Sequence, residues 1–314
     1  MHQTIQIQIE KTGPATSIQD QGRRLSQHLA IACAGVIDDY AYRWANKLLN
    51  NPLNASVIEI TSGGEHWTIK QPGWLSYTGA DLDAQLNQTP IKPWQTYYLN
   101  AGDQLKFNGP KQGFRAYIAT PGGWQANHHY QSTSCALREK ASGGWGHWLK
   151  AGDQLNANPA PSQPRANQTK KLAKRYQPDY QTLNLPIILC RQSQGFNPKQ
   201  LQAWLTQPAK VMPASNRMGI RLTSPQKLEW QAPTPLSEPT ANGAIQITPS
   251  GEAIILMADR QTLGGYPKIG HLSWWARCQI AQAKPFSQIQ WQITDINQAR
   301  NKQNEWYRYW NSSS

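Results

Sequence analysis

The stretch LSEPTANGAIQITPSGEAIILMADRQTLGGYPKI, residues 236–269, contains two apolar runs that predict a pair of β-strands. Residues 244–248 alternate between apolar and polar side chains, and residues 253–258 are mostly apolar. Alternation is typical of a half-buried strand, and a short apolar run is typical of a strand inside a core. The second run leads into ADRQTLGGYPKI, residues 258–269, which is rich in polar side chains and glycine. We therefore expect a polar loop at the end of a core strand.

Strand-like runs also dominate the rest of the chain. They lie at residues 4–10, 57–61, 66–70, 96–99, 114–119, 187–190 and 220–222. The sequence AGDQL occurs twice, at 101–105 and 151–155, and each copy predicts a tight turn that enters a strand. The 22 Pro and 23 Gly are typical of many short strands joined by turns.

Few segments show helical periodicity. In DDYAYRWANKLLNN, residues 38–51, apolar residues recur at helical spacing and Asp38 is suited to cap the first turn. Asn197-Pro198 predicts the start of a second helix. Ser273 and Thr294 are candidate caps for two more. The fold class expected is therefore mostly β, with a few short helices.

The length and a change in composition predict two domains. A chain of 314 residues is long enough for two hydrophobic cores. Between Asn156 and Pro186, Pro, Asn, Gln and basic residues replace the apolar alternation, which is typical of a linker. We place one β domain in residues 1–165 and another in residues 166–314, each expected to be a barrel or a sandwich.

The formal net charge is +13, from 31 Lys and Arg residues against 18 Asp and Glu residues. One basic cluster stands out, Lys170-Lys171 with Lys174-Arg175. No nucleic-acid-binding motif accompanies it. We therefore expect an anionic small substrate or an acidic partner protein rather than a nucleic acid.

The sequence predicts a cytoplasmic protein. No run of about 18 apolar residues is present that would span a membrane, and the N-terminus lacks the apolar core of a secretory signal. The cysteines are far apart and show no CxxC spacing, which favours reduced thiols. They are Cys33, Cys135, Cys190 and Cys278.

Common motifs for phosphate loops, dinucleotide binding and metalloproteases are absent, and the seven histidines show no metal-ligand spacing. No metal site is therefore predicted. Three polar segments remain as candidate sites. Function is favoured for residues 258–269. In residues 213–222, Arg217 is as well suited to bind an anion as to serve a structural role. A loop-stabilising role is slightly favoured for the polar residues of 13–39.

Several of these segments together resemble one family, the biotin-dependent carboxyltransferase family, also called allophanate hydrolase subunit 2. The matching motifs are SIQDQGR (17–23), QHL (27–29), AGVIDDYAYRWAN (34–46), IEIT (58–61), TGADL (78–82), REKASGG (138–144), SNRMG (215–219) and the stretch 236–269 quoted above. They follow the family's order over most of the chain. The chain departs from the family's usual residues at Ala34-Gly35 and at Pro239-Thr240.

The resemblance implies two cyclophilin-like β-barrel domains and obligate partners. Members include the C subunit of the bacterial 5-oxoprolinase, which acts with the KipI-like B subunit and the A subunit of that enzyme to open 5-oxoproline to L-glutamate. ATP with Mg is then expected in the complex, and no bound organic cofactor. Two alternatives stay open, a regulator like KipA that binds a KipI-like partner and a urea-type carboxyltransferase component. The second needs biotin, and no biotin-carrier motif is evident in the sequence.

The resemblance also suggests roles for individual residues. Lys268 and the amides of Gly264 and Gly265 are expected to stabilise developing negative charge. Candidate bases or metal–nucleotide ligands are Glu238, Asp259 and Asp20, and His28 is a candidate proton shuttle. The expected substrate-binding residues are Arg217 and Asn216 for an anionic group, Gln246 and Gln261 for amide groups, and Tyr266.

Overall fold

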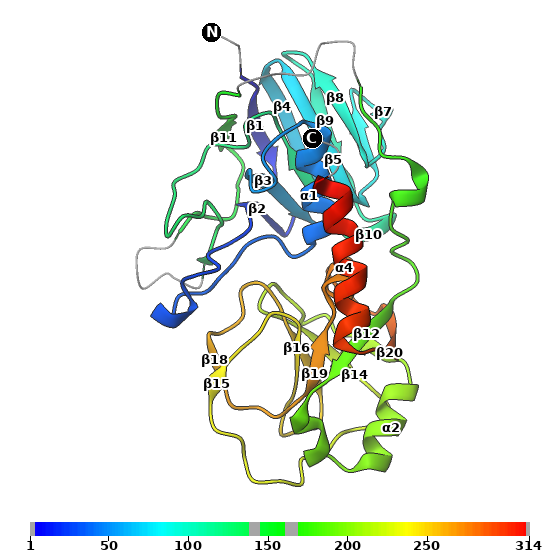
Figure 1. The fold of residues 1–314 in the computed structure, drawn as a ribbon. Coiled ribbons are helices and arrows are strands. Elements are labelled where there is room, and N and C mark those ends of the chain that lie inside the picture. Colours follow the sequence, from blue (N-terminus) through cyan, green and yellow to red (C-terminus); the bar gives the residue numbers. More distant parts are fainter. Residues whose placement is uncertain (1–3, 138–144, 161–168, 312–314) are drawn as a thin grey trace. The chain divides into compact units, whose positions relative to one another are not determined.

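The computed structural model describes residues 4–137, 145–160 and 169–311 of the chain. The chain divides into two compact units (Figure 1). Unit 1 comprises Met1–Arg24 and Ala34–Gln181, and unit 2 comprises Leu25–Cys33 and Thr182–Ser314. The predicted limit at 165/166 and the motif at 138–144 lie outside the described residues. The segment Leu25–Cys33 therefore belongs to the C-terminal unit. The predicted division into two consecutive domains places this segment in the N-terminal domain instead.

Unit 1 is built from two antiparallel sheets. One has the order β11 (Gln154–Asn156), β1 (Gln6–Lys11), β4 (Glu65–Gln71), β9 (Gln104–Phe107), β6 (Ala84–Leu86) and β7 (Thr89–Pro90). The other has the order β2 (Ala15–Gln19), β3 (Val57–Thr61), β10 (Gln112–Ala119), β5 (Gly73–Asp81) and β8 (Gln95–Leu99). Apolar side chains of both sheets, such as Ile7, Trp67 and Phe107 with Ile58 and Ile118, share one buried core.

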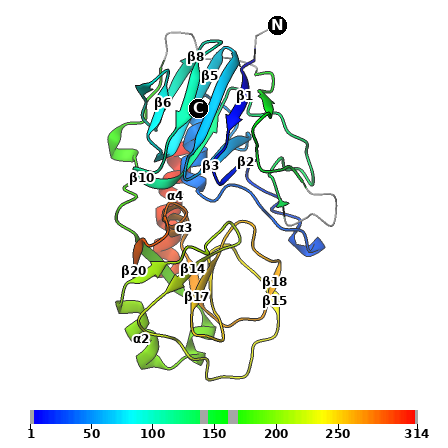
Figure 2. The same cartoon turned by 180° about the vertical axis from the view of Figure 1, so that it is seen from behind.

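Helix α1 (Asp39–Leu48) packs on the five-stranded sheet, chiefly on β5 and β10 (Figure 2). The predicted cap is confirmed, because the carboxylate of Asp38 accepts the backbone N–H groups of Tyr40 and Ala41. Ser76 and Thr78 of β5 donate hydrogen bonds to carbonyl groups of the helix. Eight of the nine residues of β5 are buried, because the helix covers one face of the strand and the core covers the other.

Unit 2 is a closed barrel of seven strands. Their order is β12 (Asn184–Leu189), β19 (Lys268–Leu272), β16 (Ala244–Ile247), β17 (Ala253–Leu256), β14 (Gly219–Thr223), β13 (Ala209–Val211) and β20 (Gln288–Ile293). The predicted strand pair at 244–248 and 253–258 is confirmed as neighbours β16 and β17. Closure comes from a parallel pairing of β12 with β20, which removes the free edges of the sheet. A two-stranded sheet, β15 (Glu238–Pro239) with β18 (Leu263–Gly264), accompanies the barrel.

The helices of unit 2 are α2 (Pro198–Thr206), α3 (Trp274–Ile280) and α4 (Ile296–Asn311). Asn197 and Ser273 cap the helices α2 and α3 through their side-chain oxygens, which confirms the predicted helix start at Asn197-Pro198 and the predicted cap Ser273. The prediction of Thr294 as the cap of the last helix is wrong. The carboxylate of Asp295 accepts the N–H groups of Asn297 and Gln298 instead, one residue further along. The described residues also contain the short 3-10 turns η1 (Gln27–Leu29) and η4 (Arg191–Gly195) in this unit and η3 (Lys174–Tyr176) in unit 1.

Both copies of AGDQL form the predicted turn before a strand. Gly102 and Gly152 adopt φ angles of 89° and 95°, where a side chain would be strained. The carboxylates of Asp103 and Asp153 each accept a backbone N–H three residues earlier, so the two turns have the same design. The mostly β fold class with few helices is thus confirmed, whereas the cyclophilin-like description stays a prediction. In the described part of the chain, no helix is both long and apolar enough to cross a membrane.

Candidate functional site

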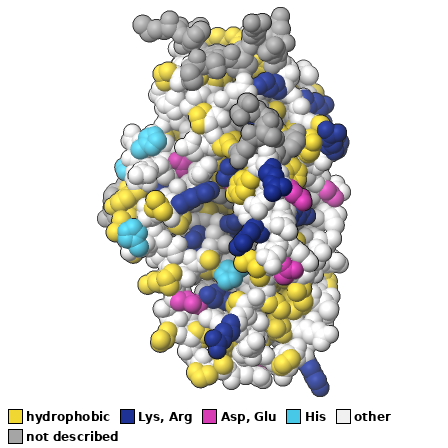
Figure 3. All heavy atoms as spheres, in the orientation of Figure 1, with side chains coloured by type: hydrophobic (Ala, Val, Ile, Leu, Met, Phe, Trp, Pro, Cys, Tyr) yellow, Lys and Arg dark blue, Asp and Glu magenta, His cyan; other side chains and the backbone are white. Residues whose placement is uncertain are grey.

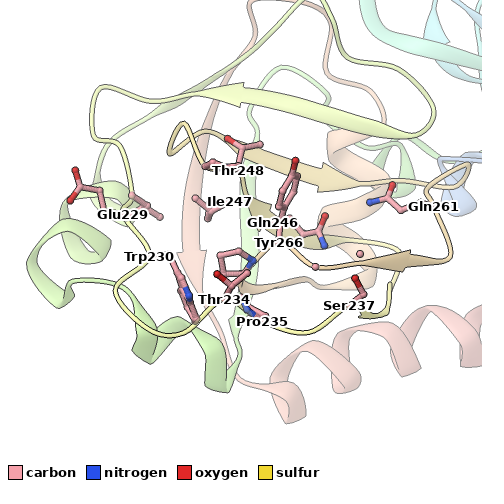
Figure 4. A pocket seen from close by; sticks show the side chains of 15 residues that line it. Glu229, Trp230, Thr234, Pro235, Ser237, Gln246, Ile247, Thr248, Gln261 and Tyr266 are labelled. Atoms are coloured by element: carbon pink, nitrogen blue, oxygen red, sulfur yellow. The ribbon is translucent and has the colours of Figure 1, made fainter.

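Unit 2 contains a cavity of about 890 Å³ beside the β15–β18 strand pair (Figure 4). Its polar lining consists of Glu229, Thr234, Ser237, Gln246, Thr248, Gln261 and Tyr266, and the backbone of Gly264-Gly265 completes one wall. Trp230 and Gln261 lie toward opposite ends of the lining, with Tyr266 between them. Its volume is within the range of about 300–1,000 Å³ that is usual for ligand pockets. The cavity therefore suits a small molecule with several hydrogen-bonding groups.

The amide of Gln246 is the most deeply buried polar group of this lining. Its side chain is 2% exposed. A Cβ atom added at Gly264 would lie 2.8 Å from the Nε2 atom of Gln246, closer than such atoms approach. Glycine at 264 thus leaves room for the amide beside β18. A bulge in the β16–β19 pairing at this point places Gln246 directly opposite Lys268.

Lys268 and Glu238 form an ion pair next to the cavity. The Nζ atom of Lys268 lies 2.6 Å from Oε1 of Glu238. Gln192 joins both residues, because its Nε2 donates to Glu238 and its Oε1 accepts the backbone N–H of Lys268. Hydrogen bonding to Lys268 holds the pKa of the Glu238 carboxyl below its usual value. Neither charged residue lines the cavity itself, but each follows a lining residue in the chain, Ser237 or Pro267.

His271 is a partly buried histidine on the same strand as Lys268. Burial lowers the pKa of its imidazole, and the positive charge of Lys268 lowers it further. Both effects favour the neutral ring at pH 7. No sequence pattern selects His271, because its relation to Lys268 depends on strand β19 and on the burial that the barrel provides.

Segment 25–33 supports the loops around the cavity. The Nε2 atom of Gln27 donates hydrogen bonds to the carbonyl groups of Thr240 and Thr262, at 2.8 and 3.1 Å. Its Oε1 accepts from the buried guanidinium of Arg260 at 3.2 Å. Burial lowers the pKa of Arg260. These contacts fix the residues that flank Gln261 on both sides, a relation that no spacing in the sequence shows.

Arg217 and Asp259 form a bidentate ion pair at the ends of β14 and β17. The Nε and Nη2 atoms of Arg217 each lie 2.9 Å from a carboxylate oxygen of Asp259. The backbone N–H of Asp259 also donates to the carbonyl of Arg217. Asn216 closes the adjoining turn by accepting the N–H of Met218. Asp259 thus accepts hydrogen bonds from two nitrogen atoms of Arg217, the residue that the sequence suggests for binding a substrate anion. Substrate binding by Arg217 and Asn216 stays a prediction.

Neither Asp20 nor His28 is among the residues that line this cavity. Asp20 belongs to unit 1, and its carboxylate accepts hydrogen bonds from Gly22, Ser132, Thr133 and Ser134. Burial alone would raise the pKa of Asp20, but these hydrogen bonds outweigh it and hold the pKa below its usual value. His28 is exposed on η1. The proton-transfer roles suggested for both residues stay predictions.

The structure therefore gathers part of the predicted set in unit 2. The predicted residues that it brings to the cavity or beside it are Lys268, Glu238, Gln246, Gln261, Gly264, Gly265 and Tyr266. No signal in the sequence points to Trp230, Ser237 or Gln192, which are separated from residues 258–269 along the chain. Among the described residues, no group of three or more His, Cys, Asp or Glu side chains gathers closely enough to hold a metal ion.

A seven-stranded barrel with an amide-lined cavity, accompanied by a two-sheet unit, defines a two-unit, mostly β class of protein. Within that class the chain belongs to the family described as "Carboxyltransferase domain, subdomain A and B", whose model matches residues 29–293. It is 29% identical to the C subunit of the 5-oxoprolinase of Escherichia coli (strain K12), over 96% of this chain and 96% of that protein. It is 31% identical to the C subunit of the 5-oxoprolinase of Haemophilus influenzae, over 90% and 89% of the two chains.

Solved structures support the fold. The crystal structure of the Kluyveromyces lactis urea carboxylase superposes with a TM-score of 0.89 at 22% identity. The match covers 99% of this chain but 29% of that chain. At this identity the similarity establishes the shared architecture and leaves the chemistry to be argued from the site.

Proposed function

We propose that the chain is the C subunit of an ATP-dependent 5-oxoprolinase, which opens 5-oxo-L-proline to L-glutamate. The observation that carries this proposal is the similarity to two proteins that are named as the C subunit of 5-oxoprolinase, which extends over at least 89% of each. The relatives' name implies partner subunits, and we propose that a KipI-like B subunit and an A subunit complete the enzyme.

The amides of the cavity are suited to a cyclic amide. Gln246 and Gln261 each offer an N–H donor and a carbonyl acceptor, and a lactam presents the complementary acceptor and donor. Because Gln246 is buried beside Gly264, its orientation is restricted, which favours one pose of the ring. Their predicted role is therefore to hold the lactam group of 5-oxoproline.

Lys268 is suited to stabilise negative charge during ring opening. In the proposed reaction, ATP transfers its terminal phosphoryl group to the lactam oxygen, water attacks the activated carbon, and the C–N bond breaks with release of phosphate. Negative charge accumulates on the phosphoryl group and on the attacked carbon's oxygens. An ammonium group held by Glu238 and next to the cavity reduces the energy of such a state. The positive net charge of +13 favours the anionic substrate and ATP.

The test is an assay of the complex with each of its chains omitted in turn. This chain is co-expressed with the candidate A and B subunits, and ATP-dependent release of glutamate from 5-oxoproline is measured. We expect activity only when all three chains are present. Activity that is unchanged without this chain would refute the enzyme assignment, and copurification with the B subunit alone would then favour a KipA-like regulator.

Carboxyl transfer is a second candidate, favoured by the description of the family itself. It requires a carboxylated biotin as donor and an amide-bearing acceptor such as urea. The same preparation is therefore assayed for ATP- and bicarbonate-dependent carboxylation of urea with a biotinylated carrier protein added. Carboxylation without 5-oxoproline cleavage would replace the first proposal with the second.

A further inference from the structure

Unit 1 contains a second cavity, of about 380 Å³, that the proposed function does not use. Its lining includes Gly79, Lys92, Trp94, Lys171, Lys174 and Tyr180. Asp81 also lines it and forms an ion pair with Lys92, at 3.0 Å. The two remaining lysines therefore leave the cavity with a net positive charge.

Two of the four residues in the basic cluster at 170–175 line this cavity, and two do not. The Nζ atom of Lys170 donates to Asn50 at 2.8 Å, and the guanidinium of Arg175 lies 4.9 Å from the ring centre of Tyr176. Within the described part of the chain, the ammonium groups of Lys171 and Lys174 have no such partner. Lys171 and Lys174 thus line the cavity, whereas Lys170 and Arg175 contact other residues outside it.

The backbone that carries these lysines is held at several points. Residues 170–172 pair with the start of strand β8, because the backbone N–H of Thr96 donates to the carbonyl of Lys170 and that of Leu172 donates to the carbonyl of Trp94. The side chain of Gln177 donates to the carbonyl of Leu172. Beyond the turn η3, the hydroxyl of Tyr180 donates to Asp38. The basic wall of the cavity is therefore fixed to the sheet and to the cap of α1.

Another part of the lining lies at a bulge between β5 and β10. The pairing shifts between Gln112 and Ala116, next to Gly79. Gly79 has a φ of 84°, and a Cβ atom there would lie 2.4 Å from the carbonyl oxygen of Arg115. Only glycine fits this position. Bulges with such glycines often occur beside binding sites, because they turn the strand and open space.

We propose that this cavity binds a small organic phosphate, a ligand that goes beyond the proposed function of the unit 2 site. A phosphate monoester carries a charge of about −1.5 to −2 at pH 7, which two ammonium groups match. A single carboxylate carries a smaller negative charge. Lysine ammonium groups bind phosphate as point charges. The buried rings of Trp94 and Tyr180 form low-dielectric walls, which strengthen the attraction.

Isothermal titration calorimetry with phenyl phosphate tests this proposal on the full chain. The double variant Lys171→Gln/Lys174→Gln is compared with Lys170→Gln/Arg175→Gln, which removes the same charge from the same segment outside the cavity. Benzoate, a monoanion of similar shape, is the control ligand. We expect the first double variant to weaken phenyl phosphate binding by at least about tenfold, and the second by less than about twofold. We expect benzoate to bind more weakly than phenyl phosphate.

Three results would overturn the proposal. They are an absence of wild-type binding up to about 10 mM, equal weakening in the two double variants, and equal affinity for benzoate and phenyl phosphate. Lys171 and Lys174 are exposed, so their replacement by glutamine should leave the fold intact. Circular dichroism checks the fold of each variant. None of these outcomes depends on 5-oxoprolinase activity, so the two proposals fail separately.

Discussion

Lys268 and His271 are linked by charge as well as by strand β19. Burial is the main cause that lowers the pKa of His271, Lys268 lowers it further, and Glu238 raises it. The charges of Lys268 and Glu238 therefore act in opposite directions on the pKa of His271, in addition to the larger effect of burial.

This coupling gives a prediction for the titration of His271. Replacing Lys268 by alanine removes a positive charge, so the pKa of His271 should rise toward that of an ordinary histidine. Glu238→Gln removes a negative charge, so the pKa should fall further. The measurement is the pH dependence of the His271 ring signals by NMR, in both variants and the wild type. Identical titration curves in all three proteins would show that the charges do not act on His271.

Asp20 is a buried polar residue with a structural role in unit 1. Its carboxylate accepts hydrogen bonds from two backbone N–H groups and from the hydroxyl groups of Ser132, Ser134 and Thr133. It thereby joins the end of β2 to residues 132–134. Such a saturated carboxylate is suited to stabilise the fold of a loop.

We predict that Asp20→Asn lowers the free energy of unfolding by about 2–4 kcal/mol at pH 7, since an amide cannot accept all these bonds. The folded pKa of Asp20 lies below the unfolded value near 3.9. Its contribution is therefore fully present above the unfolded pKa and is lost as pH falls through the folded pKa. Urea unfolding of both proteins between pH 7 and pH 3 should show a difference that shrinks below about pH 4. A difference that stays constant over this range would contradict the account.

At the scale of elements, aromatic side chains join helices α3 and α4 of unit 2. Trp310 is 4% exposed and packs edge-on against Trp274, with ring centres 5.6 Å apart. Trp306 stacks on Trp275 and is only partly buried. The C-terminal helix is thus held by buried aromatic contacts at its end.

Removal of the Trp310 ring should therefore destabilise unit 2. We expect Trp310→Ala to cost about 3–5 kcal/mol, as for other buried tryptophans. Trp306→Ala should cost less, because that ring is already partly in water. Chemical unfolding followed by circular dichroism compares the two variants. Equal stability of Trp310→Ala and the wild type would contradict the packing described.

Local patterns were sufficient to predict most elements of both units. β3 lies at the predicted residues 57–61, α1 begins after its predicted cap, and α2 begins at the predicted Asn197-Pro198. The strands that the sequence does not predict include β2 and β5 of unit 1 and β13, β19 and β20 of the barrel. β5 is buried on both faces, so its sequence lacks the alternation of a half-buried strand. Local sequence patterns carry no information on strand order. The closure of the barrel by the pairing of β12 with β20 therefore could not be predicted from them.

The candidate site shows the same limit at the scale of the whole molecule. Residues 258–269 were selected from their own composition, because a strand end rich in polar groups is a local feature. Gln192, Gln27 and Trp230 are distant in sequence and join the site only through the folded chain. Charge is likewise a property of the whole surface, and Lys and Arg side chains are spread over the face shown in Figure 3.

The kcat for ATP-dependent glutamate release by the assembled complex tests the central claim most directly, when Lys268 is replaced by alanine. Lys210→Ala, which changes an exposed lysine on β13, is the matched control. We predict a fall in kcat of about 100-fold or more for Lys268→Ala, with assembly and fold intact, and no change for Lys210→Ala. A folded, assembled Lys268→Ala enzyme with wild-type kcat would contradict the assignment of this cavity as the working site.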